Sequence, residues 1–189
     1  MSGRRSRRGS DAATGEDATG SPPRKQRIGT RFKMLQRIIA LGADFDVENE
    51  RGERVFHIDG TSLRQRGTLL FTDMQGHEMY RVQEKLLRVR DRIDIYRGDD
   101  LAARVYNALF SPLRDRFRVE IPGDEHLMAH GNVLYNEYAI ERDNRDVARV
   151  SKQWFRVGGT YGVEVAQSED ELLLLAITVV IDMMSHEGT

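Results

Sequence analysis

The segment from Glu171 to Met184 reads ELLLLAITVVIDMM and is apolar on almost every side of a helix. Its polar residues are Glu171, Thr178 and Asp182. A helix without a polar face lies inside a protein core or inside a bilayer. A bilayer span needs about 20 apolar residues, whereas a run of roughly 10–14 is more typical of a buried core helix. The sequence therefore predicts a hydrophobic core helix over about residues 169–185.

Short segments in which apolar and polar residues alternate precede this helix, and each is typical of a strand with one buried face. The sequence RDRIDI from Arg90 returns 24 positions later as RDRFRV from Arg114, and this spacing indicates one hairpin per repeat. The alternating apolar residues include Phe45 and Val47, Ile93 and Ile95, Phe117, Val119 and Ile121, and Tyr161, Val163 and Val165. Turn residues separate such segments at positions 49–52, 73–76, 97–100, 122–125 and 143–144.

The hairpin repeats predict the fold class, a mainly β protein with about twelve antiparallel strands. Strands in that number avoid exposed edges most simply by closing into a barrel. A barrel of this width has a lumen that its own inward side chains do not fill. We therefore expect a closed antiparallel barrel around the hydrophobic C-terminal helix.

Charge is distributed unevenly along the 189 residues. The first 40 residues hold ten Lys/Arg and three Asp/Glu, a balance of +7, whereas the remainder has a balance of −8. Residues 1–30, here called the basic arm, are rich in Gly, Ser, Arg and Pro, and we expect them to be disordered. Such an arm attracts anionic membranes or nucleic acid, or it is a solubilising tail without a partner.

Composition narrows the function classes. The chain has no Cys, which excludes disulfides, a thiol nucleophile and a zinc ribbon, and fits a reducing cytoplasm. Residues 9–23 contain no apolar run, so we expect neither a Sec nor a twin-arginine signal. The length suits one globular domain, predicted over residues 31–186, after the arm.

Several residues are candidates for chemistry. His126 and His130 lie four apart and could share a metal, although no third ligand is evident and a turn-and-strand context is favoured. Asp182 is either a buried functional carboxylate or, as we favour, a residue of the last helical turn that meets solvent or an arginine at the barrel mouth. Trp154 with Phe155 is either a membrane or nucleic-acid contact or, by default, core.

Two arginine-rich strands could each present cations on one face. Three arginines alternate in each strand, but Asp91, Asp94, Asp115 and Glu120 lie among them, which favours a solvated, mutually neutralising surface. The candidate anionic-lipid contacts are Arg88, Arg90, Arg92, Arg114, Arg116 and Arg118 in these strands, and Arg4, Arg5, Arg7, Arg8, Arg24, Lys25 and Arg27 in the basic arm.

Three segments resemble the LURP-one-related proteins, which have the tubby C-terminal-like fold, and in particular their small prokaryotic members. They are RFKMLQRIIALGADFDV ending at Val47, EKLLRVRDRIDIY from Glu84, and VARVSKQWFRVGGTYGVEV from Val147 followed by the apolar helix. The resemblance covers about residues 31–186. Periodicity alone would allow an amphipathic helix over residues 31–41, but the resemblance implies that the segment from Phe32 to Ile38 is the first strand.

The resemblance implies little about activity, because the prokaryotic members have no established one. More distant relatives on this fold bind phosphoinositides or scramble phospholipids, but no matching lipid-site motif is present and the fold alone is an analogy. No Ser-His-Asp order, paired carboxylates or cofactor loop is recognisable. The sequence therefore predicts no enzyme, no cofactor and no metal site.

The leading hypothesis is a cytoplasmic binding or scaffold module that contacts anionic lipid headgroups at the inner membrane face. The alternative is a protein-interaction or stress-related scaffold without lipid affinity and with an unknown partner. Nucleic-acid binding by the basic arm is a further alternative, against which the acidic body argues, and specific nucleic-acid binding is not expected. An enzyme with a cavity beside Asp182 is the last alternative.

Overall fold

The structure is a computed structural model that describes residues 27–35, 44–60, 68–83, 92–107, 115–123, 126–155 and 160–186. Residues 1–26 of the basic arm lie outside this range, so its predicted disorder stays a prediction. The strands are β1 Gly29–Leu35, β2 Phe45–Asn49, β3 Arg54–Asp59, β4 Thr68–Asp73, β5 Glu78–Gln83, β6 Arg92–Arg97, β7 Asp100–Asn107, β8 Asp115–Glu120, β9 Leu127–Asn132, β10 Glu137–Arg142, β11 Arg145–Ser151 and β12 Thr160–Ala166. A 3₁₀ turn, η2 Val133–Tyr135, and the helix α3 Glu171–His186 complete the described elements.

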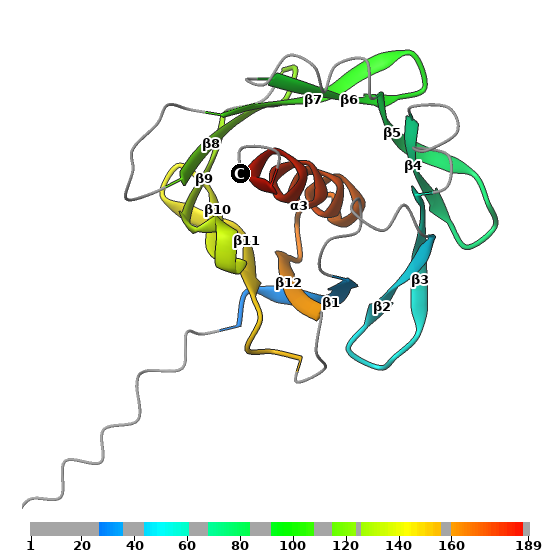
Figure 1. Ribbon diagram of the computed structural model, residues 1–189, viewed down its shortest axis with the longest axis horizontal. Helices are drawn as coiled ribbons and strands as arrows, with labels where there is room; N and C mark the ends of the chain where they lie inside the picture. The colour runs from blue at the N-terminus through cyan, green and yellow to red at the C-terminus, as the bar shows by residue number, and fades with distance from the viewer. Residues whose placement is uncertain are drawn as a thin grey trace, which may run out of the picture.

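The strands form one closed antiparallel barrel in which each strand pairs with its neighbours in sequence, and β1 pairs with β12. Figure 1 shows this ring with α3 in its middle. The predicted fold class is therefore confirmed. The β1–β12 pairing, here called the seam, runs from Gly29 opposite Ala166 to Leu35 opposite Thr160.

The core lies between α3 and the inward side chains of the strands. Every residue of α3 from Leu172 to Met184 is buried, and the inward positions of the strands contribute Val, Ile, Leu, Phe, Met and Tyr. Full burial of one large apolar side chain is worth about 1.5–3 kcal/mol before the entropy of ordering is subtracted. The helix therefore supplies a major share of the apolar surface that stabilises the barrel.

Asp170 fixes the start of α3 against the barrel wall. Its Oδ1 accepts a hydrogen bond from the backbone N–H of Leu173 at 2.9 Å, which is the pattern of an N-cap. Its Oδ2 accepts from the hydroxyl of Tyr80 and from the guanidinium of Arg97, each at 2.6 Å. The Arg97 guanidinium also lies over the Tyr80 ring, 4.7 Å from its centroid. The Asp170 carboxylate therefore both caps the N-terminus of α3 and attaches the helix to β5 and β6.

The segment around Phe32 is a strand, as the resemblance implied, and not the amphipathic helix that periodicity would allow. β1 begins at Gly29, and Phe32 and Met34 point into the core while Arg31 and Lys33 point outward. A Cβ on Gly29 would lie 1.7 Å from the carbonyl oxygen of Val165, so only glycine fits this start of the seam. Residues 36–43, which complete the segment, lie outside the described residues.

Candidate functional site

A buried polar region lies in the lumen around Asp182 of α3. Asp182 is only 4% exposed, so the expectation that it faces solvent at the barrel mouth is wrong. The physical reason is that α3 continues to His186, which leaves Asp182 a full turn inside the helix. Thr178, one turn earlier, is also buried, and its hydroxyl donates to the carbonyl oxygen of Leu174 at 2.8 Å.

Two tyrosines surround this region from the barrel wall. Tyr138 of β10 and Tyr161 of β12 are buried, and their pKa values are raised, first by loss of solvation and then by the nearby charge of Asp182. The hydroxyl of Tyr161 makes no hydrogen bond to the residues that the structure describes. These groups keep the lumen polar at one level without opening it to solvent.

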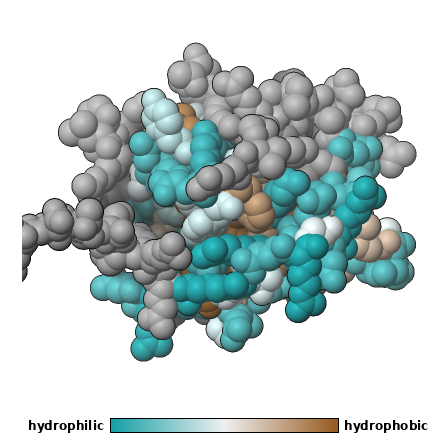
Figure 2. All heavy atoms as spheres, turned by 90° about the horizontal axis from the view of Figure 1, so that it is seen from below, coloured by the Kyte–Doolittle hydropathy of each residue, from teal (hydrophilic) through white to brown (hydrophobic). Residues whose placement is uncertain are grey.

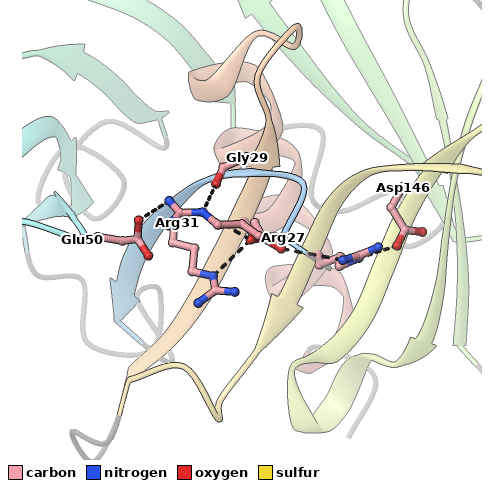
Figure 3. A network of polar contacts seen from close by, with 7 residues as sticks. Arg27, Gly29, Arg31, Glu50 and Asp146 are labelled. Carbon is pink, nitrogen blue, oxygen red and sulfur yellow. Dashed lines mark hydrogen bonds and ion pairs between the residues drawn. The ribbon is translucent and has the colours of Figure 1, made fainter. Parts of the chain in front are cut away.

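A second polar network lies outside the barrel, on the seam. Glu164 of β12 is the centre of this network, and its side chain is 1% exposed although it points away from the core. Its Oε1 accepts from Nε of Arg31 at 3.2 Å and lies 3.9 Å from Nε of Arg27, and its Oε2 lies 3.9 Å from Arg149. Figure 3 shows Arg27 and Arg31 from close by, with dashed lines for the contacts of the network.

Two of the three arginines in this network have another carboxylate. Arg27 also pairs with Glu50, and Arg149 also pairs with Asp146. Arg31 has no second carboxylate among the described residues, and its two terminal nitrogens make no hydrogen bond or ion pair there. In Figure 3 these nitrogens lie on the side of Arg31 that faces away from the dashed contacts.

Trp154 and Phe155 cover the outer face of the seam. A Cβ on Gly162 would lie 2.8 Å from Trp154 and 3.0 Å from Phe155, so the absence of a side chain at position 162 lets both rings lie against β12. The guanidinium of Arg31 lies over the Trp154 ring at 4.6 Å from its centroid, within the range of a cation–π contact. Trp154 is half-buried outside the barrel, so the default expectation of a core tryptophan is wrong.

The arginines predicted as lipid contacts fall into two groups, and the structure describes the side chains of three. Arg27 belongs to the seam network. Nε of Arg92 lies 3.4 Å from Asp94, and the same carboxylate accepts hydrogen bonds from Nε and Nη2 of Arg104 at 2.8 and 3.2 Å. Arg118 lies 3.3 Å from Glu120. All three are paired with acids, which matches the mutually neutralising surface expected from the sequence.

The remaining predicted contacts cannot be placed. β6 begins at Arg92 and β8 at Asp115, so three-arginine stripes are not seen within the described strands. The backbone of Arg116 lies in β8, opposite His130 of β9. The side chain of Arg116 is not described. The other predicted contacts lie outside the described residues, namely Arg4, Arg5, Arg7, Arg8, Arg24, Lys25, Arg88, Arg90 and Arg114.

The two histidines considered for a metal have other contacts. His126 contacts the Arg118 guanidinium, and Nε2 of His130 lies 2.9 Å from Glu141. Within the described part of the chain no group of three or more His, Asp or Glu side chains could hold a metal ion. The structure therefore does not bring these histidines together as a site.

The seam network is the part of the site that sequence reasoning missed. Glu164 alternates with Val163 and Val165, and Arg31 alternates with Phe32, which marks both as outward residues. The predicted closed barrel implies that the first and last strands pair, but no sequence pattern gives the register that places Arg31 opposite Glu164, 133 positions along the chain. Figure 2 shows the face on which β1 and β12 lie in Figure 1, and its described residues are mostly hydrophilic.

The fold and the filled lumen define a class of protein, a closed twelve-stranded barrel around a central hydrophobic helix, as in tubby C-terminal-like proteins. A family model described as LURP-one-related matches residues 30–182. The chain belongs to the LURP-one-related family.

Two comparisons agree with this membership. The chain is 24% identical over 159 residues to the uncharacterized protein YxjI of Bacillus subtilis (strain 168). The aligned region covers 81% of this chain and 92% of the relative. An X-ray structure of an Arabidopsis thaliana protein superposes with a TM-score of 0.59 at 12% identity, over 84% of this chain and 93% of that one. The structural likeness extends to the fold alone.

No helix among the described residues is both long enough and apolar enough to cross a membrane.

Proposed function

We propose that this protein is a non-enzymatic binding module that associates with anionic phospholipid at the cytoplasmic face of the membrane, and that the basic arm drives the association. The observation that carries the proposal is the charge split, with +7 in the first 40 residues and −8 in the remainder. Basic residues near an anionic bilayer contribute about 1 kcal/mol each, and salt screens this attraction.

The filled lumen supports the same proposal. Because α3 is buried from Leu172 to Met184, the lumen is occupied by the protein's own side chains, and binding by this fold has to use outer surfaces or connecting segments. The barrel arginines Arg92, Arg104 and Arg118 are paired with acids on that surface. The arm is therefore the favoured source of unneutralised charge.

The test is co-sedimentation of the full-length protein with vesicles. Replacement of Arg4, Arg5, Arg7, Arg8, Arg24 and Lys25 by Gln is expected to reduce binding to phosphatidylserine vesicles by at least about a hundredfold at low salt. The matched variant of opposite sign replaces Asp11, Glu16 and Asp17 by Asn, Gln and Asn, and it is expected to bind more tightly. Arm variants that bind as the wild type does would contradict the proposal.

The second candidate is a scaffold for a protein partner, in which the arm only maintains solubility. The exposed apolar side chains of Leu134 and Tyr135, next to each other on η2, favour this candidate because such residues are enriched in protein contacts. Two results together would favour the scaffold over the lipid module. Neither the wild type nor the six-residue arm variant would bind vesicles, and the variant would still bind the protein partner of the wild type.

A further inference from the structure

We propose that Arg31, held against Trp154 on the seam, binds the terminal phosphate of a phosphomonoester phospholipid headgroup. This inference rests on the proposed function and adds to it the part of the barrel that meets the membrane and the chemical class of headgroup.

The guanidinium of Arg31 is held on two sides. Its Nε donates to the buried carboxylate of Glu164, and its Cζ lies over the Trp154 ring, 4.6 Å from the centroid. An arginine that is already ordered loses little side-chain entropy when it binds a ligand. The residue is therefore preorganised for recognition.

The remaining donors of Arg31 are available. Only Nε of Arg31 is used by Glu164, and the two terminal nitrogens contact no acceptor among the described residues. The side chain is 27% exposed, so a ligand can reach it from solvent. Two terminal nitrogens of a guanidinium match two oxygens of one phosphate, a bidentate arrangement that a lysine ammonium cannot make. A terminal phosphate offers three such oxygens, whereas a diester offers two that are flanked by ester groups.

The charge balance singles out Arg31 from its neighbours. Arg27 and Arg149 each have a second carboxylate, whereas Arg31 shares Glu164 with both. Lys33, two positions along β1 on the same outward face, is already paired with Glu48 at 2.9 Å. Of these cations, Arg31 is therefore the one whose positive charge is least neutralised, and a phosphate dianion is expected to bind there.

The basic arm joins the barrel close to Arg31, which favours a membrane lipid as the source of the phosphate. Lys25 is six residues from Arg31, so their Cα atoms lie within about 21 Å of each other. An arm attracted to an anionic surface thus brings the outer face of β1 near the headgroups. Trp154 adds an aromatic ring beside that face, and tryptophan is enriched at the interface between lipid and water.

Trp154 is the single tryptophan of the chain, so its fluorescence reports on this site directly. Full-length protein is titrated with vesicles containing phosphatidic acid, a monoester, and with phosphatidylglycerol vesicles of matched surface charge. We expect at least fivefold tighter binding to phosphatidic acid and a shift of the Trp154 emission with that lipid. Arg31→Lys keeps the charge beside Glu164 but lacks the paired terminal donors, and it is expected to remove the preference.

Three controls separate the possible outcomes. Arg51→Gln removes the same charge as Arg31→Gln from a side chain that is 82% exposed on the β2–β3 turn, and it is expected to change affinity less than twofold. Trp154→Leu, followed by co-sedimentation, is expected to weaken the preference because the stacking is lost. Thermal melts of each variant establish that the barrel remains folded.

An Arg31→Lys variant with wild-type preference, or equal losses in Arg31→Gln and Arg51→Gln, would overturn the assignment while leaving electrostatic membrane binding intact. The same emission shift with inorganic phosphate in the absence of vesicles would overturn the lipid as the ligand. If neither vesicle binds the wild-type protein, the proposed function itself fails.

Discussion

The lumen and the seam are both densely packed, but they use opposite chemistry. Around α3 the packing is apolar and each buried side chain contributes by leaving water, whereas on the outer face of the seam Glu164 is buried among three arginines and an aromatic pair. Apolar packing lacks direction, so the lumen supplies stability. Charged groups in fixed positions recognise ligands, so the outer face is where binding is expected.

The largest effect is expected in the lumen. Ile177→Asp places a carboxylate at a fully buried position without a designed partner, and we expect loss of a cooperative thermal transition. Large-to-small changes alone at such sites cost about 2–5 kcal/mol, and an unpaired buried charge costs more. The matched control is Leu134→Asp, at an exposed position on η2. A near-wild-type melt of Ile177→Asp would contradict a central role for α3.

A smaller effect is expected on the seam. Glu164→Gln leaves three guanidinium groups around a neutral amide, and we expect a loss of about 1–3 kcal/mol in unfolding free energy because the arginines are partly exposed and solvent screens them. Urea denaturation measures this loss. Glu53→Gln, which removes an exposed acid 4.0 Å from Arg51, should change stability by less than about 0.5 kcal/mol. Equal effects of the two changes would mean that Glu164 contributes as an ordinary surface acid.

Asp170 attaches the start of α3 to β5 and β6. Asp170→Ala removes the N-cap and the acceptor of the buried Tyr80 hydroxyl, and we expect a loss of about 1–2 kcal/mol. Asp99→Ala is a suitable control, since Asp99 is fully exposed where it pairs with Arg81. The outcome is read from the denaturation midpoints, and equal midpoints for the two variants would remove Asp170 from the attachment of the helix.

The smallest effect depends on pH. The pKa values of Tyr138 and Tyr161 are raised from the ordinary value of 10.0, so the unfolded chain releases these protons first. Their contribution is therefore fully present below pH 10 and is lost as the pH rises above 10. Tyr161→Phe should reduce the loss of stability between pH 9 and about 11, and Tyr135→Phe, at a 65% exposed position, should not. The same alkaline slope in wild type and Tyr161→Phe would contradict the burial of this hydroxyl.

The lumen was far more predictable from sequence than the seam. The apolar run from Leu172 and the alternation of Val163 and Val165 are local patterns, and they suffice for a barrel around a helix. Asp182 was misplaced because helix ends are hard to define from sequence, and α3 ends at His186, one residue beyond the expected end.

The seam depends on contacts between distant parts of the chain. Arg31 meets Glu164 only because the first and last strands pair, and Trp154 lies outside the barrel only because Gly162 leaves room for its ring. The predicted closed barrel implies the pairing of these strands, but neither their register nor the position of Trp154 appears as a spacing or a motif. The arginines that did form a visible pattern, such as Arg92 and Arg118, are paired with nearby acids instead.

We propose a division of roles in which the lumen stabilises the protein while the outer face of the seam meets the membrane. The most direct test is hydrogen exchange of the full-length protein with and without phosphatidic acid vesicles. We expect added protection in peptides covering residues 27–35 and 152–155, and unchanged exchange in α3. Protection that appears in α3 instead, or that leaves residues 27–35 and 152–155 unaffected while the protein is bound, would contradict it.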